Sequence, residues 1–467
     1  MTISRPRPAA LAALAAVLTA AVATATVAPA AATTTSSGDL ESAGWTTGMP
    51  RPTTATTAVA PLGTTGTSTS RAAGTTTTDA SATSTTTVAD LTSTIASRLT
   101  TRAKDTRLGT AWSGQVVDLA TGRAVWSKNT TTTRIPASNE KLVTAYVAMK
   151  SLGAGATLTT TVLQGSRYRS SIYLKGAGDP TLTSARLRTM ASTTASAVKA
   201  QGITAVKVFV DDSLFPAPVN ATGWRAEWVP SEVAPVRALV VDQVNVMDTS
   251  VNAGYVLADQ LRSYGLTVNG VARAVVESGS TTVARSTSPS VGSMVQAMLN
   301  VSQNDYAEAL FRLAALKRGF SGDWAGARAN ALQVLQRYGV YTNGLVFYDG
   351  SGLSRSNRMP VTTALYLVKK MRTQPDVNSV VFASSGMPVA GVSGTLENRF
   401  TTAPTSCARS IVRAKTGSLD DVVTLSGISQ GADGRERLFS LLVNADTATD
   451  SARAAVDALT ATSTGCY

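Results

Sequence analysis

Hydrophobic and polar residues follow different patterns in different parts of this chain. Between residues 115 and 126, apolar residues lie on both sides of a turn at Gly122, which predicts two strands. A helix is predicted to begin at Ser138, because Leu142, Tyr146 and Met149 follow at helical spacing. Near the C-terminus the pattern predicts three strands and a closing helix, over residues 411–415, 422–428, 438–444 and 452–459.

The middle of the chain has a pattern of its own. From about residue 160 to residue 283, short strand-like runs such as 171–174 and 205–210 alternate with Gly, Pro and Asp turns and a few helical stretches. Between residues 293 and 338 the apolar spacing becomes helical. The chain is therefore predicted to be an α+β protein in which helices flank an antiparallel sheet and an α/β module is inserted.

The first ninety residues do not have the pattern of a folded domain. Residues 1–32 begin with Arg5 and Arg7, continue with an Ala/Leu/Val-rich run and end in small residues, which is typical of a secretory signal peptide. An uncleaved membrane anchor is the alternative. Residues 33–90 are mainly Thr, Ser, Ala and Gly, which predicts a flexible linker before globular patterning starts near Leu91. We therefore expect a secreted, extracytoplasmic protein.

The composition excludes several kinds of chemistry. The 467 residues include no histidine and only two cysteines. Catalytic triads that use histidine, His-ligated zinc and Cys-rich metal or iron–sulfur sites are therefore excluded, and we expect no metal and no cofactor. A nucleophilic enzyme with this composition must use Ser or Thr and find its base among Lys, Glu, Asp or Tyr.

Charge and cysteine usage bear on partners and on the compartment. The formal net charge is +13, but Lys and Arg are scattered and aromatic residues make up only 5%, which argues against a nucleic-acid partner. Two interpretations remain: peripheral association with an anionic cell wall or membrane surface, and simple solubility. Export also permits a disulfide between Cys407 and Cys466, with two free thiols as the alternative.

The first motif with candidate chemistry joins Ser138 and Lys141. The two residues are three positions apart at a predicted helix start, so they share a helical face and the lysine Nζ can reach the serine Oγ. The helix N-terminus adds backbone N–H groups beside the serine. A lysine held away from water can lose its proton and act as the base that histidine would otherwise provide.

Two further motifs follow later in the chain. Ser302 and Asn304 lie two residues apart in the helical region, where a loop joining helices can present both to a cleft. A predicted strand ends in Lys415-Thr416-Gly417-Ser418, and the edge of such a strand can bind an extended peptide. Gly417 would let a substrate approach the backbone closely, and Lys415 could hold a carboxylate.

In this order, the three motifs resemble the S-x-x-K, S-D-N and K-T-G signature of penicillin-binding proteins and class A β-lactamases, with Gln303 in place of the Asp. Ser138 and Ser302 are 164 residues apart, which leaves room for an inserted module. The chain is similar in this respect to the D-alanyl-D-alanine carboxypeptidase/endopeptidase family, the low-molecular-mass class C penicillin-binding proteins. Further blocks of family-like sequence support the resemblance, at residues 176–182, 210–215, 234–239, 349–355 and 391–400.

The resemblance implies a fold and a domain order. A transpeptidase-like domain of the serine β-lactamase/DD-peptidase type would comprise residues 91–159 and 290–467, with residues 160–289 as the inserted module. Since this module contains none of the three motifs, we expect acylation not to depend on it. In the family an acidic residue of the module contacts the free amine of the stem peptide, and here Glu227 or Glu232 would take that part.

The resemblance also implies a reaction and roles for residues. Ser138 would attack the terminal D-Ala-D-Ala bond of a peptidoglycan stem peptide with Lys141 as base, Ser302 would relay the proton, and β-lactams would acylate the same serine. Substrate binding would fall to Asn304, Lys415, Thr416, Gly417 and Ser418. The expected function is carboxypeptidase activity, with endopeptidase activity in addition, in a bacterial cell wall or envelope. A serine β-lactamase and a catalytically silent wall-binding protein of the same fold are the alternatives.

Overall fold

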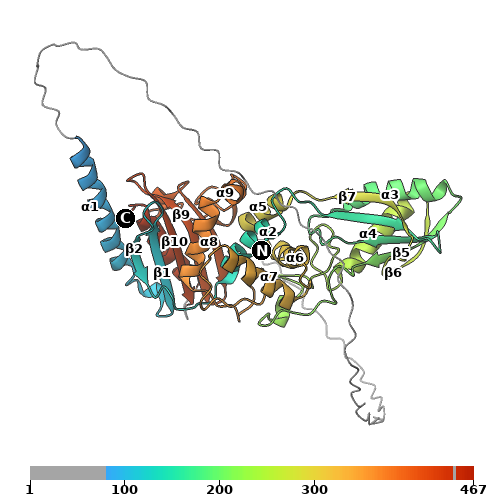
Figure 1. The fold of residues 1–467 in the computed structure, drawn as a ribbon, viewed down its shortest axis with the longest axis horizontal. Coiled ribbons are helices and arrows are strands. Elements are labelled where there is room, and N and C mark those ends of the chain that lie inside the picture. The colour runs from blue at the N-terminus through green and yellow to red at the C-terminus, as the bar shows by residue number, and fades with distance from the viewer. Residues whose placement is uncertain (1–79, 445–448) are drawn as a thin grey trace, which may run out of the picture. The chain divides into compact units, whose positions relative to one another are not determined.

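The computed structural model describes residues 80–444 and 449–467 (Figure 1). The predicted signal peptide and residues 33–79 of the predicted linker lie outside the described residues. The structure corrects the end of that linker, because helix α1 (Ala80–Arg102) begins well before Leu91. The physical reason lies further along the helix: Ile95 and Leu99 are four residues apart on one face and are both buried, which anchors a helix that continues towards the N-terminus.

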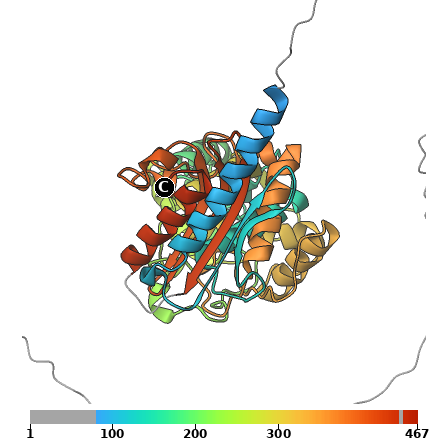
Figure 2. The ribbon, with the colours of Figure 1, turned by 90° about the vertical axis from the view of Figure 1, so that its left-hand side faces the viewer.

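The first sheet joins segments from both ends of the described chain. Its order is β2-β1-β10-β9-β8, and every neighbouring pair is antiparallel. The strands are β1 (Trp112–Asp118), β2 (Ala124–Lys128), β8 (Val412–Leu419), β9 (Val422–Gln430) and β10 (Glu436–Asn444). Helices α1 and α10 (Thr449–Ser463) pack against one face of this sheet and against each other, as Figure 2 shows. The strands predicted near the C-terminus are therefore confirmed, with β8 at the edge.

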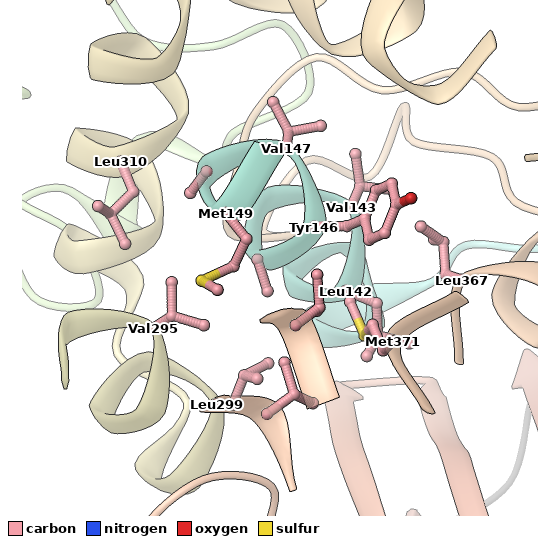
Figure 3. Close-up of a cluster of buried hydrophobic side chains, with 14 of the residues drawn as sticks. Leu142, Val143, Tyr146, Val147, Met149, Val295, Leu299, Leu310, Leu367 and Met371 are labelled. Atoms are coloured by element: carbon pink, nitrogen blue, oxygen red, sulfur yellow. The ribbon is translucent and has the colours of Figure 1, made fainter. Parts of the chain in front are cut away.

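A layer of helices covers the opposite face of this sheet. Helix α2 (Lys141–Ser151) lies at its centre, and all of its residues from Lys141 to Met149 are buried. Figure 3 shows its apolar side chains packed among residues of the neighbouring helices. These neighbours are α5 (Val291–Val301), α6 (Asn304–Lys317), α7 (Trp324–Arg337), α8 (Val361–Thr373) and α9 (Pro375–Val381). A helix buried all round is held rigidly, so the residues at its N-terminus are fixed in place.

A second sheet lies between α2 and α5 in the sequence. Its order is β6-β5-β4-β3-β7, with β4, β5 and β6 parallel and β3 antiparallel to both of its neighbours. The strands are β3 (Thr159–Gln164), β4 (Ser171–Lys175), β5 (Ala205–Asp211), β6 (Thr267–Arg273) and β7 (Thr281–Thr287). Helices α3 (Ser184–Lys199) and α4 (Thr249–Ser263) pack with it around a separate apolar core. Apart from Thr159, the first residue of β3, the sheet falls within residues 160–289, the segment predicted as an α/β insertion.

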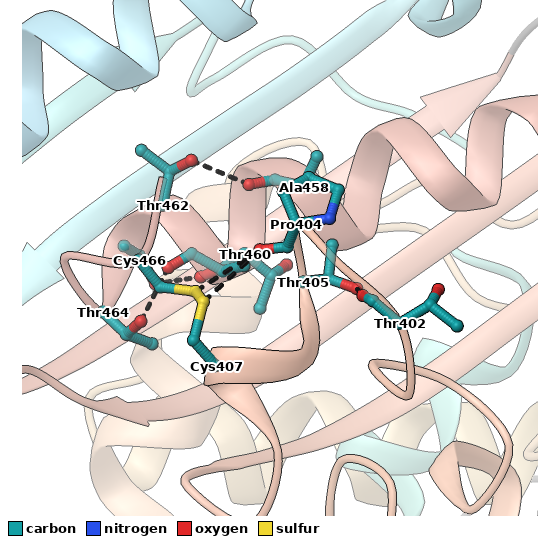
Figure 4. Close-up of a disulfide and its surroundings, with 11 residues drawn as sticks. Thr402, Pro404, Thr405, Cys407, Ala458, Thr460, Thr462, Thr464 and Cys466 are labelled. Carbon is teal, nitrogen blue, oxygen red and sulfur yellow. Dashed lines mark hydrogen bonds between the residues drawn. A yellow bond between two sulfur atoms is a disulfide. The ribbon is translucent and has the colours of Figure 1, made fainter.

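The C-terminus is tied to the chain by a disulfide. Cys407 lies in the short helix η5 (Ser406–Ala408) and Cys466 follows α10, and the two are bonded with their Cα atoms 6.0 Å apart (Figure 4). The closed segment spans 59 residues, so the bond restricts the unfolded chain considerably. Among the described residues, no helix is both long and apolar enough to cross a membrane.

Candidate active site

Ser138 lies in a short helical turn, η2 (Ala137–Glu140), directly before α2. The residue before it, Ala137, has a φ of +45°, a left-handed conformation that costs a non-glycine residue roughly 1–3 kcal/mol. Neighbouring strands hold this turn in place: the Thr424 hydroxyl of β9 donates to the Pro136 carbonyl over 2.9 Å and accepts from the Asn139 amide. Ser138 is therefore presented at a strained corner between the sheet and the buried helix.

Lys141 lies directly behind the serine. Its Nζ donates to Ser138 Oγ over 3.0 Å, to Asn304 Oδ1 over 2.7 Å and to the Ser351 carbonyl over 2.7 Å. Its side chain is fully buried. Burial lowers the pKa of Lys141 to about 8, although the nearby Glu308 and other carboxylates oppose the shift. The predicted proximity of the serine and the lysine is present, and the lysine has the electrostatic environment of a base.

Ser302 and Asn304 lie where α5 meets α6. Helix α5 ends at Ser302, whose φ of +63° turns the chain sharply, and α6 begins at Asn304. The Asn304 amide links two parts of the site, because its Oδ1 accepts from Lys141 while its Nδ2 donates to the Glu232 carbonyl over 2.8 Å. The sequence prediction of a loop joining two helices describes this junction correctly.

The third motif occupies the edge strand β8. Lys415 is fully buried and its Nζ donates to the Thr416 carbonyl over 2.9 Å. Burial, together with the charge of Lys141, holds the pKa of Lys415 well below its ordinary value. Thr416 Oγ1 is hydrogen-bonded to Thr395 Oγ1 over 2.7 Å, and Ser418 is exposed. A side chain at position 417 would clash, since a Cβ there would lie 2.3 Å from Thr424 Oγ1 and 2.9 Å from the Ser138 nitrogen.

These residues surround one cleft of about 600 Å³. Of the residues predicted from the sequence, Ser138, Glu232, Ser302, Asn304, Thr416, Gly417 and Ser418 line it. Lys141 and Lys415 lie buried behind it. Glu227 does not line it: this residue is exposed on the short helix η3 (Ala226–Trp228), so the geometry favours Glu232 over Glu227.

Several residues of the cleft were not predicted. Leu353, Thr395, Asn398, Arg399 and Arg453 also line it. Leu353, Thr395, Asn398 and Arg399 belong to the family-like blocks at residues 349–355 and 391–400, so the sequence located their segments without giving them a role. Arg453 comes from α10, and no feature of the sequence pointed to it.

Polypeptide of the predicted module reaches the site, although the expectation that acylation does not depend on the module stays a prediction. The Trp224 indole donates to Asp349 Oδ2 over 2.8 Å, and the Ala234 N–H donates to Asp305 Oδ1 over 2.9 Å. The Glu232 carbonyl accepts from Asn304, as described above. Residues 224–234 thus contact residues around the site, and Glu232 of this segment lines the cleft, although the segment contains no catalytic motif.

The chain is similar to one family of known proteins. The family model for D-Ala-D-Ala carboxypeptidase 3 (S13) matches residues 95–252 and 243–463. Carboxypeptidase DacB of Mycolicibacterium smegmatis is 32% identical over 380 residues, which cover 76% of this chain and 80% of the relative. A D-alanyl-D-alanine carboxypeptidase of an Actinomadura species is 28% identical over 436 residues, which cover 73% of this chain and 79% of the relative.

A solved structure supports the fold. The crystal structure of penicillin binding protein 4 (dacB) from Haemophilus influenzae matches with a TM-score of 0.68 at 21% identity, covering 78% of this chain and 97% of that chain. The predicted fold class is therefore confirmed. Because the family model spans both sheets, the chain belongs to the D-Ala-D-Ala carboxypeptidase 3 (S13) family and is a serine D-Ala-D-Ala carboxypeptidase.

Proposed function

We propose that Ser138 is the nucleophile of this carboxypeptidase and that Lys141 is its base. The observation that carries the proposal is the 3.0 Å contact between Lys141 Nζ and Ser138 Oγ, made by a fully buried lysine whose pKa is lowered to about 8. A lysine with an ordinary pKa would be almost entirely protonated at neutral pH and could not accept the serine proton. Ser138 Oγ would bond to the carbonyl carbon of the scissile D-Ala-D-Ala bond while Lys141 takes its proton.

The departing D-alanine needs that proton when the C–N bond breaks. Ser302 lines the cleft next to Asn304, the amide that holds Lys141, so Ser302 is suited to pass the proton to the leaving amine. Lys415, buried near Lys141, would support this transfer through its positive charge. Water would then hydrolyse the ester on Ser138 and regenerate the free enzyme.

The cleft also contains groups suited to hold the peptide. Asn304 would bind the backbone on the acyl side, and the strand edge at Thr416 and Ser418 would bind the terminal carboxylate, supported by Lys415. The N–H groups of Ser138 and Ser418 would form the oxyanion hole, in which each donor contributes roughly 3 kcal/mol. Gly417 permits this arrangement, because its Cα lies close enough to Ser138 that an added Cβ would be 2.9 Å from the Ser138 nitrogen.

The substrate would be the stem peptide of peptidoglycan, which the enzyme would process outside the cytoplasm of a bacterium. Cleavage of peptidoglycan cross-links would be a second activity, and the protein would associate peripherally with the cell wall. The exposed carboxylate of Glu232 at the cleft wall suits a free amine on that peptide. β-Lactams imitate the D-Ala-D-Ala group and would acylate Ser138. The M. smegmatis and Actinomadura relatives carry carboxypeptidase names, and the H. influenzae protein has also been solved with a β-lactam.

Two measurements on one preparation test the proposal. Wild-type protein should be labelled by fluorescent penicillin and should release D-alanine from a synthetic peptide ending in D-Ala-D-Ala, while Ser138→Ala should do neither. Rapid loss of the label through hydrolysis would indicate a β-lactamase. Labelling without release of D-alanine from any stem peptide would indicate a penicillin-binding protein with no peptidase activity.

A further inference from the structure

The third hydrogen bond of Lys141 comes from a segment outside the three motifs. Ser351 belongs to the loop of residues 349–354, here called the 349–354 loop. The Ser351 carbonyl accepts from Lys141 Nζ over 2.7 Å. The same loop packs under the nucleophile: a Cβ at Gly352 would lie 1.9 Å from the Ala137 carbonyl oxygen. The position of this loop therefore determines where the lysine amine lies relative to Ser138.

One carboxylate of helix α6 holds that loop. Glu308 is fully buried, and its two oxygens accept from the N–H groups of Gly350 and Ser351 over 2.9 and 2.7 Å. Asp349 holds the loop from the other side, accepting from the N–H groups of Gly352 and Ser354 over 3.1 and 2.7 Å. Each planar peptide unit joins the carbonyl of one residue to the N–H of the next, so Glu308 fixes the two units on either side of Gly350, and Asp349 fixes the following unit, which contains the Ser351 carbonyl.

Glu308 and the motif residue Asn304 lie four positions apart on the same helix and therefore on the same face. Asn304 reaches Lys141 Nζ directly, and Glu308 holds the backbone N–H of Ser351, the residue whose carbonyl accepts from Lys141. One turn of α6 thus controls two of the three acceptors around the base. In the sequence, the carboxylate of Glu308 therefore follows the motif Ser302-Gln303-Asn304 by one helical turn.

We propose that Glu308 is a positioning residue for the reaction, holding the 349–354 loop so that the Ser351 carbonyl keeps Lys141 Nζ within reach of Ser138 Oγ. This inference rests on the proposed function of Lys141 as the base. A glutamine at position 308 would turn an N–H₂ group towards one of the two backbone N–H groups, so one of the two hydrogen bonds would be lost and the loop would shift. A displacement of about 1 Å at a catalytic group can cost on the order of 100-fold in rate.

Glu308 also acts on Lys141 through its charge. Its negative charge favours the protonated lysine, so its removal lowers the pKa of Lys141 further. The other titratable groups around this pair are Glu140, Asp305, Asp349, Arg312 and Lys415. Burial and the charge of Asp349 raise the pKa of Glu308 itself to about 8, so Glu308 is partly ionised over the pH range in which Lys141 loses its proton, and its charge acts on the lysine there. A Glu308→Gln variant should therefore show a pH profile whose acid limb has moved to lower pH, which a merely destabilised protein would not show.

Glu140 provides a matched control. It is as deeply buried as Glu308 and adjacent to Lys141 in the chain, but within the described part of the chain neither of its carboxyl oxygens has a hydrogen-bond partner. Burial raises the pKa of Glu140 well above its ordinary value, so Glu140→Gln replaces a neutral group by a neutral group. The variant should leave both the rate and the pH profile of acylation close to wild type.

The experiment is the rate of acylation by a fluorescent penicillin between pH 6 and pH 10, normalised to the fraction of molecules that finally becomes labelled. Glu308→Gln should lower the plateau of the acylation rate at high pH about 10- to 100-fold, and it should move the acid limb of the pH profile to lower pH. Glu308→Asp keeps the carboxylate but has a shorter side chain. It should therefore lower the plateau of the acylation rate and leave the acid limb of the pH profile in place. These two results with a normal Glu140→Gln control support the inference.

Four results would overturn the inference or the proposed function on which it rests. A Glu308→Gln plateau within twofold of wild type overturns the inference, as does a lowered plateau whose acid limb has not moved. If Glu308→Gln does not fold, a wild-type plateau for Glu308→Asp overturns it. A Lys141→Ala variant measured in parallel separates the two levels: if it acylates normally, the proposed function itself is wrong, whereas an inactive Lys141→Ala beside a normal Glu308→Gln refutes only the positioning role.

Discussion

Replacing Lys141 tests how much of the acylation rate depends on its buried amine. With a pKa of about 8, roughly a tenth of the lysine is neutral at pH 7, against about one molecule in three thousand at its ordinary pKa of 10.5. Burial therefore increases the population of the usable base by roughly 300-fold. The wild-type acylation rate should rise about tenfold per pH unit below pH 8 and level off above it, because only the neutral amine accepts the serine proton.

Lys141→Ala should lower the plateau rate by about 10²- to 10⁴-fold, since no histidine is present to replace the base. Lys141→Arg should be equally inactive, because a guanidinium keeps its proton over the whole range. The Ser138→Ala, Lys141→Ala double variant should be little worse than Ser138→Ala alone, because residues of one catalytic unit are not additive.

The assay is stopped-flow acylation by a fluorescent penicillin from pH 6 to pH 10, with folding checked by circular dichroism. A folded Lys141→Ala variant that acylates at close to the wild-type rate would refute the assignment of the base. A wild-type profile that is flat between pH 6 and pH 8 would refute the argument from burial.

Three further changes test the substrate wall, the strand edge and the C-terminal tie. Glu232→Ala should weaken turnover of peptides with a free side-chain amine and spare penicillin labelling, while the matched control Glu227→Ala should change neither; equal effects of both in peptide kinetics would contradict the assignment. Gly417→Ala should reduce acylation at least about 100-fold in the same stopped-flow assay, because its Cβ would meet Thr424 Oγ1 at 2.3 Å, and a normal rate would count against the close approach. Cys407→Ser should lower the free energy of unfolding by up to about 4 kcal/mol in urea titrations, whereas an unchanged midpoint would mean that the bond does not stabilise the fold.

The sequence allowed the catalytic motifs to be predicted because their chemistry is local. Ser138 and Lys141 share one helical turn, and Ser302 and Asn304 share one junction, so spacing alone brings their side chains together. Gly417 could be predicted in the same way, as a strand residue with no side chain to block an approaching backbone.

The remaining features of the site depend on contacts between distant segments, which spacing does not reveal. The Ser351 carbonyl reaches Lys141 from 210 residues away, and Arg453 enters the cleft from the last helix. Glu227 and Glu232 could not be distinguished in the sequence, because only the fold of residues 224–234 against α6 decides which one lines the cleft. The same contact explains why the predicted insertion, which contains no motif, still contributes Glu232 to the lining of the cleft.

The central claim is that Ser138 carries the acyl group, and intact-protein and peptide mass spectrometry after brief exposure to benzylpenicillin tests it most directly. We predict one adduct per molecule, located on the peptide that contains Ser138, with the same site trapped during turnover of a D-Ala-D-Ala peptide. An adduct on any other residue, or undiminished labelling of Ser138→Ala, would contradict the account.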